Sequence, residues 1–101
     1  MTIDEFDKLF VKMCEEEREL LMQKGIEYSG KVDRLANFKR LANDLGLLPV
    51  QILWVYLTKH LDSIRSYLKN GKVMSNETIE SRIADARNYL ALLRGLIEEE
   101  K

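Results

Sequence analysis

The stretch that decides the fold is IESRIADARNYLALLRGLI, residues 79–97. Its apolar side chains recur in steps of four and three, which places one set on a single stripe of a long helix: Ile79, Ile83, Ala86, Leu90, Leu93 and Ile97. A second stripe runs beside it and carries Asp85, Tyr89, Leu92 and Leu96. Apolar surface on two stripes predicts a helix that is buried on more than one side.

Asp85 begins the second stripe and is the only acid on it. A carboxylate on an apolar flank is costly to bury without a partner. Arg82 and Asn88, each three residues away, are natural local partners, and so is a residue of the preceding helix. Two interpretations stay open: an ion pair that fixes the packing of the helix, or a carboxylate that binds Mg²⁺ or a polar ligand.

Three further helices are expected upstream, over about residues 4–24, 34–45 and 49–69, and the last helix begins at Ser75 or Asn76 and runs to about residue 99. Gly25 is the expected stop of the first helix, and residues 25–32 form a loop. The other boundary residues are Asp33 and Pro49 as helix starts, and Gly46 and Asn70-Gly71 as helix ends.

Four helices joined by short loops predict an all-α fold, an antiparallel four-helix bundle in a single domain over residues 1–101. The third helix spreads apolar surface beyond its inner face through Trp54, Val55 and Tyr56. One bundle of this size can hardly cover that surface together with both stripes of the last helix. We therefore expect self-association, most simply as a two-fold homodimer.

Composition and charge limit the cellular compartment and the partners that we expect. The net charge of −1 gives no strong nucleic-acid signature. The single cysteine, Cys14, cannot form an intrachain disulfide, which suits a reducing compartment. The first residues do not resemble a signal peptide, and no apolar run reaches the roughly 18 residues that span a bilayer. We expect a cytoplasmic protein without a membrane partner.

Two segments carry polar residues that could hold a ligand. In the third helix, His60 projects close to the direction of Leu53 and Leu57, so it is expected to be partly buried, as a hydrogen-bonded core residue or as part of a site. Its neighbours Lys59, Asp62 and Arg65 could equally form a solvated charge ladder. The segment from Lys24 to Lys31, with Tyr28 and two glycines, could hold a phosphate or be a plain connector. It fits no P-loop pattern.

A glutamate-rich run, residues 15–19, places two carboxylates on one side of the first helix. Such runs are common on solvated helix faces, and this is the simpler interpretation.

Taken in order, these landmarks resemble small helical proteins of phages and prophages. They are Lys24-x-x-x-Tyr28, Arg34-Leu-Ala-Asn37-Phe38, Lys59-His60-Leu-Asp62-x-Ile64 and Glu80-x-x-x-x-Asp85-x-x-Asn88-Tyr89-Leu90. The pattern is also similar to the family called nucleotide-modification-associated domain 1. That resemblance implies a part in phage nucleotide or DNA-base modification, without a settled reaction.

The last helix is more distantly similar to the MazG-like all-α nucleotide pyrophosphohydrolases, whose carboxylates bind Mg²⁺. Asp85 matches the aspartate of their Glu-x-x-Asp helix, but Arg82 stands where the glutamate belongs. Lys59 and His60 lie where the preceding helix of that family carries glutamates. We therefore expect no appreciable hydrolysis of ordinary nucleoside triphosphates, because a phosphoryl-transfer metal needs several facing carboxylates.

The residues and the resemblance together suggest an accessory protein of nucleotide or DNA-base modification metabolism that binds a nucleotide-like ligand between its helices. The expected ligand-binding residues are Lys24, Tyr28, Asn37, Lys59 and His60, and Asp62 and Asp85 are candidate ligands of a possible Mg²⁺. The alternative is a non-catalytic helical module that binds itself or another phage protein. A site requires these side chains to meet at one concave pocket, whereas a module leaves them dispersed.

Overall fold

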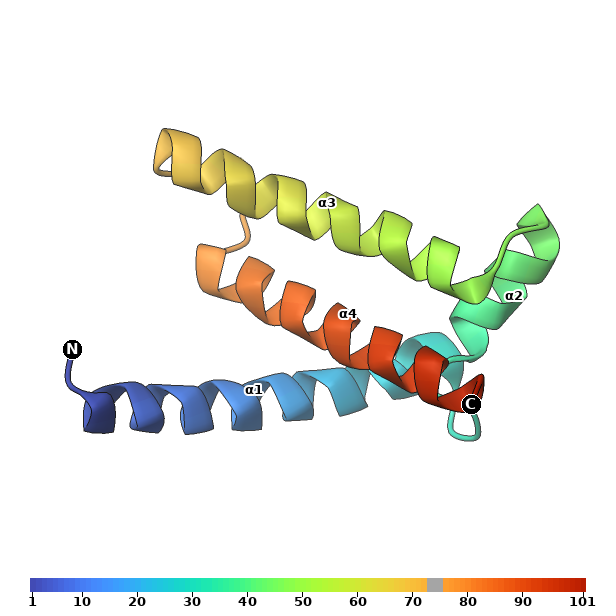
Figure 1. The fold of residues 1–101 in the computed structure, drawn as a ribbon, viewed down its shortest axis with the longest axis horizontal. Coiled ribbons are helices and arrows are strands. Elements are labelled where there is room, and N and C mark those ends of the chain that lie inside the picture. The colour runs from blue at the N-terminus through green and yellow to red at the C-terminus, as the bar shows by residue number, and fades with distance from the viewer. Residues whose placement is uncertain (73–75) are drawn as a thin grey trace.

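The computed structural model describes residues 1–72 and 76–101, and within them it contains four helices and no strand (Figure 1). The helices are α1 (Ile3–Ser29), α2 (Ala36–Leu45), α3 (Pro49–Asn70) and α4 (Ile79–Glu99). The predicted all-helical class is confirmed.

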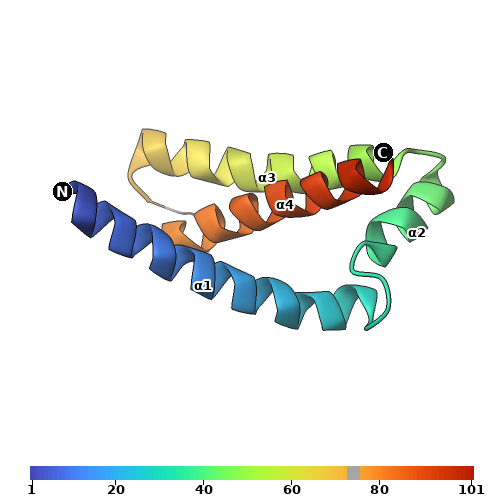
Figure 2. The same ribbon diagram turned by 60° about the horizontal axis from the view of Figure 1, so that its bottom comes forward.

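The long helix α4 lies between α1 and α3 (Figures 1 and 2). The chain bends by 106° between α3 and the short helix α2, which contacts both α1 and α3 at one end of the molecule. Within the described residues, α1 and α3 do not contact each other. Since α2 has only 10 residues, it covers one end of the space between them and leaves the rest open.

The core lies where α2, α3 and α4 meet. Its most deeply buried large side chains are Phe38, Leu53 and Leu57. The Phe38 ring makes edge-to-face contacts with Tyr56 and Tyr89, with ring centroids 6.3 Å apart in both pairs. Such contacts add to the stabilisation from area burial. They fix the short helix α2 against the two long helices beside it.

The predicted end of the first helix at Lys24 is wrong. Helix α1 continues through Gly25 to Ser29 and ends at Gly30, whose φ of 75° is a conformation that favours glycine. Gly25 is buried inside the helix, where it lies against the side chain of Arg34. The expected loop over residues 25–32 therefore begins only after Ser29.

Most other boundaries agree with the sequence. Gly46 and Gly71 end α2 and α3 in left-handed conformations, and Pro49 opens α3. The start of α2 differs from the prediction, because the helix begins at Ala36 with Leu35 as its N-cap, not at Arg34 with Asp33 as its cap. Asp33 instead accepts a hydrogen bond from the Leu35 backbone N–H at 3.0 Å, in the turn that precedes α2.

The predicted caps of the last helix need correction. The cap is Thr78, whose hydroxyl oxygen accepts from the Ser81 backbone N–H at 3.1 Å, and Asn76 precedes it. Ser75, the other predicted cap, lies outside the described residues. Thr78 presents the same hydroxyl acceptor to the helix start as Ser75 would.

The two stripes of α4 have different environments. The stripe that starts at Asp85 faces the interior, with Leu92 and Leu96 buried in the core. Of the other stripe, Ile83, Leu90 and Ile97 are exposed. The sequence therefore predicted the apolar character of this helix. It did not predict that half of the first stripe is exposed on the single chain.

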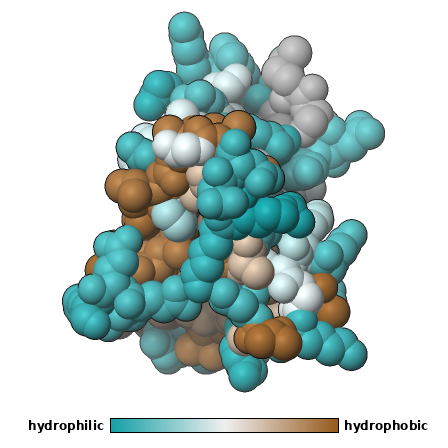
Figure 3. Space-filling view, turned by 90° about the vertical axis from the view of Figure 1, so that its right-hand side faces the viewer, coloured by the Kyte–Doolittle hydropathy of each residue, from teal (hydrophilic) through white to brown (hydrophobic). Residues whose placement is uncertain are grey.

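Exposed apolar side chains also lie on the other helices. On α3 they include Trp54, Leu61 and Leu68. Figure 3 faces the α2 end of the molecule, where hydrophobic surface appears between polar side chains, and the exposed residues of this region include Leu45 and Leu48. No single helix in residues 1–72 and 76–101 combines the length and the apolar character that crossing a membrane requires.

Candidate functional site

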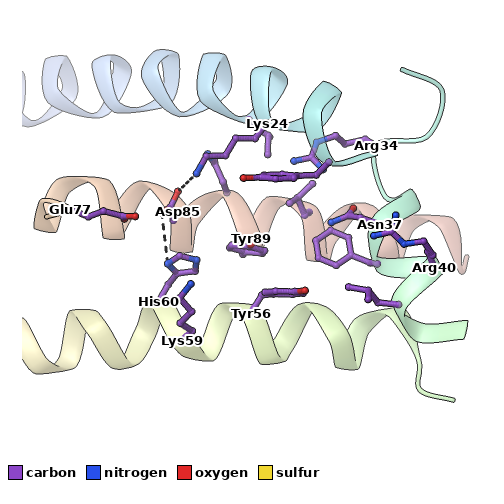
Figure 4. Close-up of a pocket in the computed structure, with 16 residues that line it drawn as sticks. Lys24, Arg34, Asn37, Arg40, Tyr56, Lys59, His60, Glu77, Asp85 and Tyr89 are labelled. Atoms are coloured by element: carbon purple, nitrogen blue, oxygen red, sulfur yellow. Dashed lines mark hydrogen bonds and ion pairs between the residues drawn. The ribbon is translucent and has the colours of Figure 1, made fainter. Parts of the chain in front are cut away.

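A cavity of about 410 Å³ lies over α4 in the space between α1 and α3, and α2 closes one end of it (Figure 4). All four helices contribute side chains to its wall. The five residues predicted to bind a ligand all line this cavity, together with Asp85: Lys24, Tyr28, Asn37, Lys59 and His60. The sequence places them across 62 positions, and the fold brings them to one concave surface.

Asp62 does not reach the cavity. It lies on the exposed side of α3, where its carboxylate is 3.8 Å from Nη1 of Arg65. The two predicted metal ligands, Asp62 and Asp85, are therefore not brought together. In the described part of the chain, no group of three or more His, Cys, Asp or Glu side chains is placed to hold a metal ion.

Asp85 is buried and paired, as the sequence predicted. Its Oδ1 accepts a hydrogen bond from Nζ of Lys24 at 3.3 Å, and its Oδ2 lies 3.8 Å from Nδ1 of His60 (Figure 4). The bonded partner Lys24 comes from α1, which the sequence did not predict, whereas His60 of the third helix lies close to the carboxylate without a hydrogen bond. Arg82, the predicted local partner of Asp85, contacts two other residues. Its Nε lies 3.4 Å from Oε2 of Glu77, and its Nη1 lies 3.4 Å from Nδ1 of His60.

His60 is a buried, neutral imidazole in the wall of the cavity. Burial lowers its pKa below the ordinary value, and the nearby Asp85 carboxylate only partly opposes this effect. Arginine can only donate, so the contact with Arg82 makes Nδ1 an acceptor and places the proton on Nε2. A neutral ring is also consistent with the 3.8 Å distance to Asp85, which is too long for a hydrogen bond.

Aromatic rings form the middle of the wall. Tyr89 is stacked with Tyr56, with centroids 6.2 Å apart and planes 9° from parallel, and with His60 at 5.2 Å. Burial raises the pKa of the Tyr89 phenol, and the nearby Asp85 carboxylate adds to the shift. Tyr89 is therefore a neutral phenol at physiological pH, and its ring belongs to a surface on which a flat ligand can stack.

The cavity carries an excess of positive charge. Four of its lining residues are cationic, namely Lys24, Arg34, Arg40 and Lys59, whereas two are acidic, Glu77 and Asp85. Each acid already has a cation beside it, since Asp85 pairs with Lys24 and Glu77 with Arg82. A concave surface with this surplus attracts anions.

Several lining residues were missed by the sequence reasoning, among them Arg34, Arg40, Tyr56 and Tyr89. One signal could have found Arg40, which lies three residues after Asn37 on the same face of α2. The same rule applied to α3 relates Tyr56 to Lys59 and His60. The expected helix over residues 34–45 placed Arg34 three residues before Asn37, but in the structure Arg34 precedes α2 and reaches the cavity from the turn.

Asn37 has a fixed orientation. Its side-chain oxygen accepts a hydrogen bond from the Ser29 hydroxyl at 2.6 Å. The amide nitrogen of Asn37 is therefore the end that is available to donate to a ligand.

The glutamate run of the first helix is mostly solvated, as expected. Glu15, Glu16 and Glu19 are exposed. Glu17 is the exception, because it is buried and its carboxylate lies 3.1 Å from Nε of Arg87 on α4. This contact helps to hold α1 against α4 and lies outside the lining of the cavity.

No protein-family model matches the chain, and neither a curated protein nor a solved structure matches it. The resemblances drawn from the short motifs therefore stay predictions.

Proposed function

We propose that this protein binds a nucleotide-like ligand in the cavity between its helices. The observation that carries the proposal is the convergence of Lys24, Tyr28, Asn37, Lys59 and His60 on one wall. Chance dispersal would have left several of them on outward faces, as happened to Asp62. The alternative, a purely structural module, predicts that these side chains are dispersed over the surface.

The chemistry of the wall matches the parts of a nucleotide. Stacked tyrosines offer a surface for a base, and the surplus of cations suits phosphate. The protonated Nε2 of His60 and the amide of Asn37 add neutral donors, which suit the carbonyl groups of a base or the hydroxyls of a sugar. Asp85 supplies the acceptor that such a ligand needs for its own N–H or O–H groups.

The metabolic setting that we propose follows the motif resemblance. The ligand would be handled by an accessory protein of nucleotide or DNA-base modification of the phage type, with or without a reaction of its own. The lack of a carboxylate cluster in the described residues favours binding without a tightly held Mg²⁺.

A thermal-shift screen of nucleosides and nucleotides, with and without Mg²⁺, tests the proposal. A ligand at about 100 times its dissociation constant stabilises the folded chain by roughly 2.7 kcal/mol. Lys59→Ala should weaken the stabilisation, whereas Lys69→Ala, an exposed lysine of the same helix, should leave it unchanged. If no compound of this class stabilises the wild-type chain, the proposal is wrong.

We further propose that the four helices of the chain form an antiparallel bundle and that two copies of it associate as a homodimer. The exposed residues Trp54, Leu61 and Leu68 step by seven along α3, and Ile83, Leu90 and Ile97 step by seven along α4. Side chains seven apart share one face of a helix, and α3 packs directly against α4. A second copy is the partner that offers the same apolar spacing in return.

A further inference from the structure

Arg34 is a cation of the cavity wall for which the described part of the chain holds no acidic partner. Its Nε is buried there without a hydrogen bond. Burial lowers the pKa of the guanidinium, which shows that the charged form has lost solvation. A half-buried arginine whose Nε lacks a hydrogen bond is stabilised when an anion binds beside its guanidinium.

The acid next to Arg34 in the sequence and the acids of the cavity wall are engaged with other cations. Asp33, the preceding residue, accepts from the Leu35 backbone N–H and from Nζ of Lys39, the latter at 2.7 Å. Lys39 also binds Glu99 at 2.9 Å. The cavity acid Asp85 pairs with Lys24. The guanidinium of Arg34 therefore lines the cavity without an acidic partner among the described residues.

The path of the Arg34 side chain is fixed by Gly25. A Cβ atom added at Gly25 would lie 2.5 Å from Nε and 2.6 Å from Cδ of Arg34. Glycine is a poor residue inside a helix, and Gly25 lies inside α1. The close approach of Arg34 gives a physical reason for a glycine there, because any larger residue would push the guanidinium away from the α1 backbone.

We propose that Arg34 is the specificity residue of the cavity, the group that selects ligands with a phosphate monoester by a forked, metal-independent contact. The inference rests on the proposed function, and it says which end of the cavity binds the phosphate. Arg34, Asn37 and Arg40 lie at the α2 end, the tyrosines in the middle, and His60 and Asp85 at the far end (Figure 4). A phosphate at the α2 end would place the base along the rings.

The choice of phosphate follows from the shape of the guanidinium. Its parallel N–H groups match two oxygens of a phosphate, and such charge-assisted pairs are stronger than neutral hydrogen bonds. Arg40 adds a second positive charge at the same end, and the Asn37 amide adds a neutral donor. A nucleoside without phosphate leaves these groups unsatisfied, so the site discriminates between the two forms.

The test is calorimetric titration of the full chain with a nucleoside monophosphate, the matching nucleoside and inorganic phosphate, all in EDTA. Wild type should bind the monophosphate about 10- to 100-fold more tightly than the nucleoside. Arg34→Met should remove most of the preference for the monophosphate, while the affinity for the nucleoside stays constant. Arg65→Met, an exposed arginine outside the cavity, should keep the ratio of wild type.

Gly25→Ala provides a second route that leaves Arg34 itself in place. The added methyl group displaces the guanidinium while alanine favours the helix, so the chain should fold and yet lose phosphate preference. If either Arg34→Met or Gly25→Ala keeps the wild-type ratio of monophosphate affinity to nucleoside affinity, the inference about Arg34 is wrong. The proposed function is unaffected by that result. Phosphate binding through Arg34 without any nucleoside or nucleotide binding supports the anion site and refutes the proposed function. Binding of none of the three refutes both.

Discussion

Lys24 and Asp85 are 61 positions apart in the sequence, and Nζ of Lys24 donates to Oδ1 of Asp85 at 3.3 Å. The contact joins the end of α1 to the middle of α4 at the wall of the cavity. It places a carboxylate and an ammonium group side by side where a ligand would contact both. The same pair also stabilises the packing of the two helices, so the site and the fold depend on one another here.

Replacing Asp85 with alanine should destabilise the chain. Removing one member of a buried ion pair typically costs about 3–5 kcal/mol. Lys24 is 42% exposed and can turn toward water, so we expect a smaller loss than this range, of about 2 kcal/mol. Urea unfolding of Asp85→Ala measures the loss, with Asp62→Ala as the matched exposed control. An unchanged urea midpoint for Asp85→Ala would mean that the pair does not stabilise the fold.

Acidification should weaken the fold through His60, the single histidine of the chain. Its pKa in the folded state lies below the ordinary value of 6.5, so the unfolded chain takes up the proton first as the pH falls. The stability contribution of the neutral ring is present above pH 6.5 and is lost as the pH falls below it.

Urea midpoints between pH 7.5 and 5.5 measure this dependence. Wild type should lose stability over that range, and His60→Gln should have a flatter profile because a glutamine does not titrate. Parallel profiles for the two proteins would show that His60 does not cause the loss.

Much of the fold follows from the sequence because apolar periodicity is a local property. The end of α2 and both ends of α3 carry glycine or proline signals whose backbone preferences act within a few residues. The end of α1 was missed for a non-local reason. Gly25 serves a contact with Arg34, nine residues later, so a residue typical of a helix end lies inside a helix.

The site was predictable only in part. Residues with unusual polarity on apolar faces, such as His60 and Asp85, were visible in the sequence because burial of such groups needs an explanation. Asp62 was included because it is close to His60 in sequence, but two residues along a helix point to different sides. The contribution of Arg34 depends on how α2 crosses the long helices, which no local pattern encodes.

Association of two copies should be visible by light scattering at micromolar concentration. The exposed stripes of α3 and α4 predict about twice the chain mass. Leu61→Lys should shift the population toward single chains, whereas Val32→Lys, at a fully exposed position elsewhere, should not. A mass of one chain across the whole range of concentrations would contradict the proposed homodimer. Capture of a different protein by the same face would favour the alternative of an interaction module.

Nucleoside triphosphates should bind without appreciable turnover. Attack at a phosphoryl centre needs several carboxylates to hold Mg²⁺ and orient water, and the described residues lack such a group. A pyrophosphate-release assay over the common triphosphates, with Mg²⁺ or Mn²⁺, measures this. Robust release that disappears in Asp85→Asn would show that Asp85 supports catalysis with fewer acids than expected.

The most direct test of the central claim is a heteronuclear NMR titration of the full chain with a nucleoside monophosphate. The account predicts that the shifts concentrate on the cavity wall, at Lys24, Tyr28, Asn37, Lys59 and His60 together, because one ligand touches all four helices. Trp54, on the exposed side of α3, serves as an internal reference that should not move. Shifts confined to the outer faces, or none at saturating nucleotide, would contradict the claim that these helices converge to bind a nucleotide.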